Sequence, residues 1–190
     1  MLFSPKETNK ELLKKEETTS SCSGQSFKTP KIQAKEIKTR KDLRATIKVL
    51  EKDSFLEFWT NGAWSNADLV EFVLEQTGKA NLYICTWSIT EVPVRKLFLL
   101  KEKDLIGSIK ALLDYRIETT SPKAIPFLKT FAEIHLTKVH AKITLIEAEN
   151  AFVTINSSAN FTKNPRLESG YISTHKQSFE FFKKIFDEYK

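Results

Sequence analysis

Strand and helix patterns alternate along most of this 190-residue chain. Short apolar runs typical of strands are each followed by apolar residues at helical spacing. Such alternation favours helices packed on a mixed sheet over a sandwich or a helical bundle. We therefore predict an α/β fold, a mixed β-sheet flanked by helices on both faces. The expected strands are 55–59, 82–87 and 109–115, followed by a hairpin of the strands around His140 and Val153. The expected helices begin at Ser65, near Pro93 and at Ser121.

Two helices have ends that the sequence marks. One is expected to begin at Ser65, with Asp68 in its first turn, and to end at Gly78. The last helix of the chain is expected to start where Thr174 and Gln177 stand at capping-box spacing. Their expected buried stripes are Leu69, Phe72 and Val73 in the first and Phe179, Phe182 and Phe186 in the last.

Residues 1–41 differ in composition from residues 42–190. They are rich in Lys, Glu, Thr and Ser, so they bury too little apolar surface to offset the entropy of ordering. We predict a disordered arm over 1–41 and one folded domain over 42–190. The arm carries ten Lys and Arg against five Glu, which is nearly all of the net charge of +6. This composition suits either a nucleic-acid-binding arm or a solubilising leader. The candidate nucleic-acid-binding residues are Lys28, Lys31, Lys35, Lys38, Arg40 and Lys41.

Several classes of protein are disfavoured by composition. No run approaches the twenty apolar residues of a membrane span, and charges interrupt the N-terminus early, so we expect a soluble, cytoplasmic protein that does not bind membranes. Only Cys22 and Cys85 are present, which disfavours a disulfide framework or a thiolate metal site, and Cys85 is expected in the core. The three histidines lack the spacing of a zinc site. We expect no metal and no cofactor.

The residues with the clearest chemical meaning lie between 140 and 168. On strands, His140 and Lys142 would share one face, as would Ser158 and Asn160, because side chains alternate. Phosphoryl transfer needs a nucleophile, fixed positive charge, neutral donors and a carboxylate that orients the nucleophile. These four residues and Glu168 fill those roles. A structural histidine is the simpler reading for His140 alone, but the combination favours phosphate chemistry.

At these residues the sequence resembles the phospholipase D superfamily, whose signature joins His-x-Lys to a downstream Gly-Ser-x-Asn and a Glu. It is most similar to the short, single-motif nuclease-like members, over residues 55–172, including the segments 86–90 and 112–116. The resemblance implies hydrolysis of nucleic-acid phosphodiester bonds through a phosphohistidine, without a metal. Because the family builds one site from two such motifs, it also implies a homodimer. The implied catalytic residues are His140, Lys142, Ser158, Asn160 and Glu168.

Two positions depart from that signature. Glu147 stands where the family has Asp, and strand parity from His140 places it on the opposite face, where we expect it to brace the fold. Ser157 replaces the Gly, which in the family allows close approach of the backbone. A longer hairpin turn around residues 148–150 is expected to absorb the extra residues between these positions.

Alternative functions therefore stay open. The first is a catalytically weak or inactive nucleic-acid-binding module with the same fold, which Glu147, Ser157 and the basic arm favour. The second is a lipid phosphodiesterase, although the sequence has no apolar anchor. Trp59, Trp64 and Trp87 are candidates either for stacking on bases or for burial.

Overall fold

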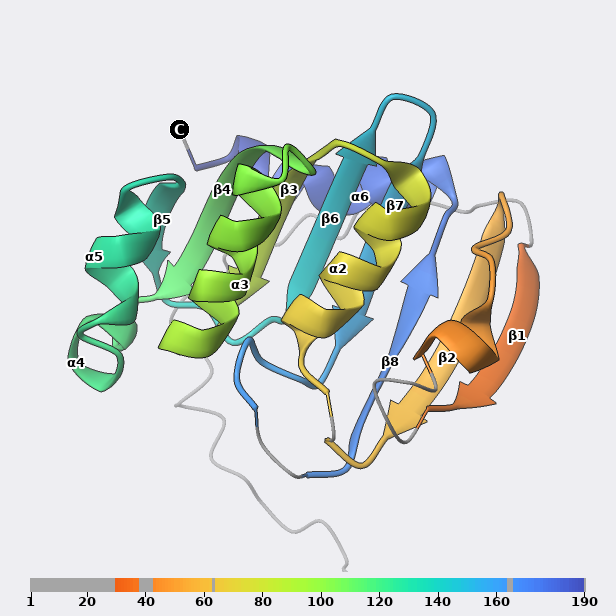
Figure 1. The fold of residues 1–190 in the computed structure, drawn as a ribbon, viewed down its shortest axis with the longest axis horizontal. Helices are drawn as coiled ribbons and strands as arrows, with labels where there is room; N and C mark the ends of the chain where they lie inside the picture. Colours follow the sequence, from red (N-terminus) through yellow and green to blue (C-terminus); the bar gives the residue numbers. More distant parts are fainter. Residues whose placement is uncertain (1–29, 38–42, 63, 164–165, 190) are drawn as a thin grey trace, which may run out of the picture.

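The computed structural model describes residues 30–37, 43–62, 64–163 and 166–189, which build an eight-stranded mixed sheet (Figure 1). The strand order is β1-β2-β8-β7-β6-β3-β4-β5. The pairs β1/β2, β3/β4 and β4/β5 are parallel, and the central pairs are antiparallel. The strands are β1 (Lys31–Glu36), β2 (Ser54–Thr60), β3 (Ala80–Thr86), β4 (Ile106–Asp114), β5 (Glu133–Thr137), β6 (Ile143–Ala148), β7 (Phe152–Ser157) and β8 (Glu168–Ser173).

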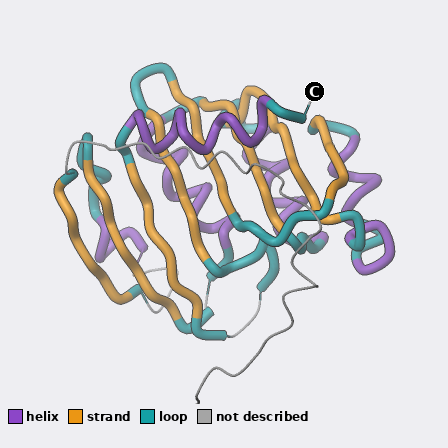
Figure 2. Tube along the Cα trace, turned by 180° about the vertical axis from the view of Figure 1, so that it is seen from behind, coloured by secondary structure: helices purple, strands orange, loops and turns teal. Residues whose placement is uncertain are grey.

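Helices cover both faces of this sheet. One face carries η1 (Leu43–Ile47), α2 (Asn66–Thr77), α3 (Glu91–Glu102), α4 (Ile117–Thr120) and α5 (Ala124–Lys129), and Figure 1 shows α2 and α3 lying over the central strands. The other face carries α6 (Lys176–Asp187), which crosses the sheet in the view from behind (Figure 2). The larger apolar cluster lies under α2 and α3, and a smaller one lies under α6. The predicted α/β architecture, with helices on both faces, is confirmed.

Three expected strands and one expected helix lie where the sequence indicated, whereas the helix expected to begin at Ser121 begins at Ala124. Strands β2, β3 and β4 occupy the expected places, with ends shifted by one to three residues. Helix α2 begins after Ser65, whose backbone N–H donates to the Asp68 carboxylate at 2.8 Å, and it ends at Gly78, whose φ of 77° suits glycine. The predicted stripe of Leu69, Phe72 and Val73 is buried.

The predicted start of the last helix is wrong. Helix α6 begins at Lys176 with His175 as its N-cap residue, so Thr174 and Gln177 do not form a capping box. The Thr174 hydroxyl instead accepts a hydrogen bond from Ser54 N at 2.9 Å and donates one to Glu51 O at 2.6 Å. Partners that are distant in sequence therefore replace the local cap. The predicted stripe is present, with Phe179 and Phe186 buried and Phe182 half-buried.

The predicted disorder over 1–41 is wrong for residues 30–37. Strand β1 pairs in parallel with β2, and Ile37 behind it is fully buried. The Ile37 carbonyl accepts a hydrogen bond from Trp64 Nε1 at 3.0 Å. Composition was misleading because an edge strand gains its stability from pairing with β2 and not from its own apolar content. The remaining part of the proposed arm, residues 1–29 and 38–41, lies outside the described residues.

Two of the candidate nucleic-acid-binding lysines belong to this edge strand. Lys31 forms an ion pair with Glu51 at 2.6 Å, and Lys35 donates to Thr46 O at 2.6 Å. Both side chains therefore have partners within the fold, which weakens the case that they bind nucleic acid. The other candidates, Lys28, Lys38, Arg40 and Lys41, lie outside the described residues.

Deleting residues 1–41 is therefore expected to destabilise the domain, whereas deleting residues 1–29 keeps all of β1. Full burial of one Ile side chain is worth about 1.5 to 3 kcal/mol, and the ladder between β1 and β2 is lost with it. Urea unfolding of the two truncated chains measures the difference. Equal unfolding midpoints would contradict a structural role for β1.

Two further expectations concern the membrane and Cys85. Among the described residues, the helices are too short and too polar to cross a bilayer. Cys85 is buried as predicted, and this burial raises the pKa of its thiol to about 11. The thiol is therefore a neutral member of the core near neutral pH. Cys22 lies outside the described residues.

Candidate active site

His140 and Lys142 lie in the loop that leads into β6, so the prediction that they stand on a strand is wrong by a few residues. Pairing of β6 with β3 begins only at Ile143. The two side chains nevertheless meet. Lys142 Nζ lies 3.2 Å from His140 Nδ1 and 3.4 Å from Nε2, and it donates to the His140 carbonyl at 2.6 Å. Folding of the loop, and not strand parity, brings the ammonium to the imidazole.

Ser158 and Asn160 directly follow the end of β7, beside this loop. Ser157 N donates to Lys142 O at 3.1 Å, which joins the segment of the His-Lys pair to the segment of the Ser-Asn pair. The Asn160 amide is held by Thr86, the last residue of β3, with 3.3 Å between Thr86 Oγ1 and Asn160 Oδ1. The Asn160 Nδ2 group donates to no other residue that the structure describes. The ends of β3, β6 and β7 thus gather the predicted residues at one edge of the sheet.

Ser158 and Glu168 contact each other. The Ser158 hydroxyl donates to the Glu168 carboxylate and accepts a hydrogen bond from Ser169 N at 3.0 Å. The predicted hydroxyl donor for phosphate is therefore committed to Glu168 in this structure. Across the described part of the chain, Glu168 makes no hydrogen bond to His140, so it does not orient the imidazole of its own chain here. Ser158, Glu168 and Ser169 line a groove of about 360 Å³ together with the exposed side chains of Trp59 and Leu167.

Charge at the site centres on Lys142. Partial burial lowers the pKa of this ammonium, and the nearby Glu168 carboxylate opposes that change. A partly desolvated ammonium interacts more strongly with a phosphate than an ammonium in bulk water does.

Three residues beside the site were not among the predicted catalytic residues, although Trp87 was a candidate for stacking on bases. The Trp87 ring lies 5.6 Å from the His140 ring, and the Arg116 guanidinium lies over Trp87 at 5.0 Å. The buried Asp114 carboxylate accepts a hydrogen bond from Val139 N, next to His140, at 3.3 Å. Their position was the available signal: they lie at or just after the carboxyl ends of two parallel strands, where binding sites of α/β sheets gather.

Glu147 lies away from this cluster, near the other end of β6. Its carboxylate accepts a hydrogen bond from the Tyr83 hydroxyl at 2.8 Å, and its strand partner is Asn81. Its predicted position away from His140 agrees with this contact, although the parity argument used a strand that His140 does not join. The predicted hairpin turn lies between Ala148 and Phe152.

Ser157, at the position of the signature glycine, has a matching glycine beside it. Gly170 is its strand partner on β8, and a Cβ built there would lie 2.6 Å from Ser157 Cβ and 2.4 Å from Asn156 O. The Ser157 side chain is buried, and its hydroxyl donates to Asn66 Oδ1 at 3.2 Å. The close approach of the β7 and β8 backbones at Ser157 therefore depends on Gly170, which has no side chain.

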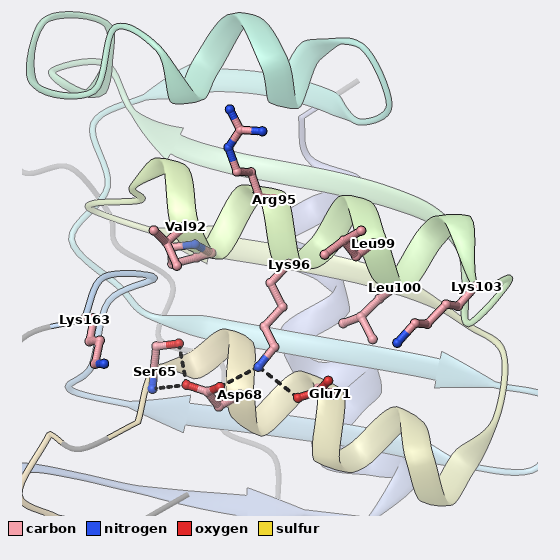
Figure 3. Close-up of a pocket in the computed structure, with 11 residues that line it drawn as sticks. Ser65, Asp68, Glu71, Val92, Arg95, Lys96, Leu99, Leu100, Lys103 and Lys163 are labelled. Atoms are coloured by element: carbon pink, nitrogen blue, oxygen red, sulfur yellow. Dashed lines mark hydrogen bonds and ion pairs between the residues drawn. The ribbon is translucent and has the colours of Figure 1, made fainter.

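A groove of about 480 Å³ lies between α2 and α3, away from these residues (Figure 3). Lys96 reaches from α3 to the Asp68 and Glu71 carboxylates of α2 and forms ion pairs with both. The cluster links the two helices that cover the sheet. It contains none of the candidate catalytic residues.

Comparison with known proteins defines the class of this fold. It is a phospholipase D-like fold, as two solved structures demonstrate. NucT from Helicobacter pylori, of the phospholipase D superfamily, matches with a TM-score of 0.55 and 15% identity over 71% of this chain and 95% of its own. Polyphosphate kinase from Porphyromonas gingivalis matches with a TM-score of 0.55 and 11% identity over 71% of this chain and 26% of its own. No family model and no curated protein matches the sequence.

Proposed function

We propose that this protein is a phosphodiesterase that hydrolyses nucleic-acid phosphodiester bonds through a phosphohistidine, with an active site shared by a homodimer. The observation that carries the proposal is the contact of His140 with Lys142 beside Asn160. In the proposal, His140 is the nucleophile, Lys142 the cation and Asn160 the amide donor. The first two contact each other, and Asn160 is bonded to the end of the neighbouring strand β3 of a phospholipase D-like sheet. NucT, which has the same fold, is a nuclease, and this supports nucleic acid as the substrate.

In the proposed reaction, an imidazole nitrogen of His140 attacks phosphorus and forms a P–N bond as the P–O bond to the leaving group breaks. The His140 of a second copy donates a proton to the leaving oxygen and then accepts one from water. That water attacks the phosphohistidine, and the P–N bond breaks. Lys142 and Asn160 stabilise the charge on the equatorial oxygens throughout.

A second copy is proposed because one chain supplies one suitable imidazole. His135 lies on β5, where it bonds to Glu133 at 2.6 Å, and His175 is the N-cap residue of α6. The exposed Trp59 and Leu167 border the groove beside Glu168, and a second copy would cover this apolar surface. Glu168, which in the described part of the chain makes no hydrogen bond to its own His140, is proposed to orient the imidazole of the second copy.

Cleavage is expected to persist in excess EDTA, because the nucleophile is an imidazole and the stabilising charges are side chains. The measurement follows a labelled DNA and a labelled RNA oligonucleotide incubated with the full chain, with EDTA and then with added Mg²⁺ or Mn²⁺. Cleavage seen only after a divalent metal is added would contradict the phosphohistidine scheme.

A second candidate function is a nucleic-acid-binding module with little or no turnover. It is favoured by two contacts within the chain: the Lys142 ammonium donates to the His140 carbonyl, and Glu168 holds the Ser158 hydroxyl. Both donors would have to exchange these partners for a phosphate. Binding of the same oligonucleotides without cleavage under any condition would select this function.

A further inference from the structure

Arg116, Asp114 and Trp87 form a cluster that borders His140 and has no part in the proposed reaction. Asp114 is the last residue of β4, and its carboxylate is 3% exposed. It accepts hydrogen bonds from Arg116 Nε at 2.7 Å and from Arg116 N at 3.1 Å. The Arg116 guanidinium holds the pKa of this carboxyl below its usual range. The buried Asp114 carboxylate therefore fixes the backbone N–H and the Nε group of Arg116.

The cluster also fixes Arg116 relative to the candidate nucleophile. Asp114 accepts a third hydrogen bond, from Val139 N, in the residue before His140. The Trp87 ring lies next to both Arg116 and His140. The Arg116 guanidinium is 5.0 Å from the centre of the Trp87 ring, and the centre of the His140 ring is 5.6 Å from it. A cation is attracted to the negative face of an indole, and this attraction also restrains the arginine. Trp87 thus contacts both Arg116 and His140, and Asp114 bonds both to Arg116 and to the backbone of the residue before His140.

The outer part of Arg116 remains open. Its side chain is 51% exposed, and within the described part of the chain its two Nη groups have no hydrogen-bond partner. A guanidinium with a fixed Nε and open Nη groups suits a phosphate, which accepts two parallel hydrogen bonds from it. We propose that Arg116 binds a backbone phosphate of the nucleic acid next to the phosphate that His140 attacks.

This inference rests on the proposed function and adds a subsite to it. Phosphates follow one another at about 3.4 Å along the axis of each strand of duplex DNA. A substrate held at His140 therefore has further phosphates within reach of the Arg116 guanidinium, which contacts the same Trp87 ring as His140. Lys142 and Asn160 serve the phosphate that reacts, and Arg116 sets the direction in which the strand leaves the site.

The test measures binding without cleavage. Full-length protein carrying His140→Asn is titrated against a fluorescein-labelled single-stranded DNA oligonucleotide over a series of salt concentrations, and Arg116→Ala is added to the same background. The expected loss of affinity is about ten- to a hundred-fold, the size of a charge-assisted hydrogen bond. The slope of log Kd against log salt is expected to fall by about one. Arg116→Lys, which keeps the charge without the paired donors, is expected to give an intermediate affinity with an unchanged slope.

Arg95 supplies a matched control. Its guanidinium is bound by Glu91 and lies 5.6 Å over Phe127, so its surroundings resemble those of Arg116 without contact to Trp87 or His140. Arg95→Ala is expected to bind like the parent. If Arg116→Ala keeps the affinity and slope of Arg95→Ala while wild type cleaves, the subsite is wrong and the proposed function stands. If wild type does not cleave and the parent does not bind, both are rejected.

Discussion

Replacing His140 with Asn is expected to lower the rate of nucleic-acid cleavage by about 10⁴-fold or more, since in the proposed reaction it removes the group that forms the covalent bond to phosphorus. Loss of a covalent nucleophile costs up to about 10⁶-fold in a serine protease. The side chain is exposed and precedes β6, so the thermal midpoint of unfolding should change little. Single-turnover cleavage and thermal melting of the same preparation measure the two quantities.

His135→Asn is the matched control. His135 also bonds to a neighbouring side chain, Glu133, but it lies on the edge strand β5. Its replacement is expected to leave cleavage unchanged. Equal losses in both variants would mean that neither histidine has the role of nucleophile.

Mixed dimers extend this prediction to the shared site. A wild-type copy paired with a His140→Asn copy has one imidazole where the mechanism needs a nucleophile and a separate acid, so the mixed dimer is expected to be inactive. Light scattering should give twice the chain mass for the active wild type. A monomer that cleaves, or a mixed dimer with half the activity, would contradict the two-copy mechanism.

The fold was predictable where its signals were local. Strand β2 alternates buried and exposed residues, and α2 carries its own start and stop signals in Ser65 and Gly78. The edge strands β1 and β5 were missed because their stability depends on pairing with β2 and β4, which no local pattern records. The same reason explains Thr174, whose hydroxyl found partners 120 or more residues away.

The sequence suggested which residues form the candidate site but did not predict their geometry. Their types indicated phosphate chemistry, and the structure brings His140, Lys142 and Asn160 to one edge of the sheet. The reason given for the first pair, a shared strand face, was wrong, because a loop conformation depends on what surrounds it. Likewise, Ser158 meets Glu168 only through the register of β7 against β8. The residue types of a sequence can therefore indicate the chemistry of a site, whereas the contacts between those residues depend on loop conformation and on which strands pair.

The second large effect is expected from Lys142→Ala and Asn160→Ala. Each is expected to lower turnover by about 10² to 10³-fold, since loss of one preorganised donor costs roughly 3 to 4 kcal/mol in the transition state. Both residues lie outside the strands, so unfolding midpoints should change little. Turnover at saturating substrate separates this effect from weaker binding. A change in KM alone would assign the two residues to substrate binding.

Glu147→Ala is expected to behave in the opposite way. It removes the acceptor of the Tyr83 hydroxyl, between two central strands, so it should lower the free energy of unfolding by about 0.5 to 1.5 kcal/mol and leave turnover unchanged. Tyr83→Phe removes the same hydrogen bond from its donor side and should give a similar loss, which a double-mutant cycle can verify. If Glu147→Ala unfolds like wild type and yet does not cleave, the carboxylate acts at the site despite its contact with Tyr83. Glu147 stands where the signature has Asp. That result would therefore mean that Glu147 has the role of the signature Asp in the reaction, and that its hydrogen bond with Tyr83 is not its main role.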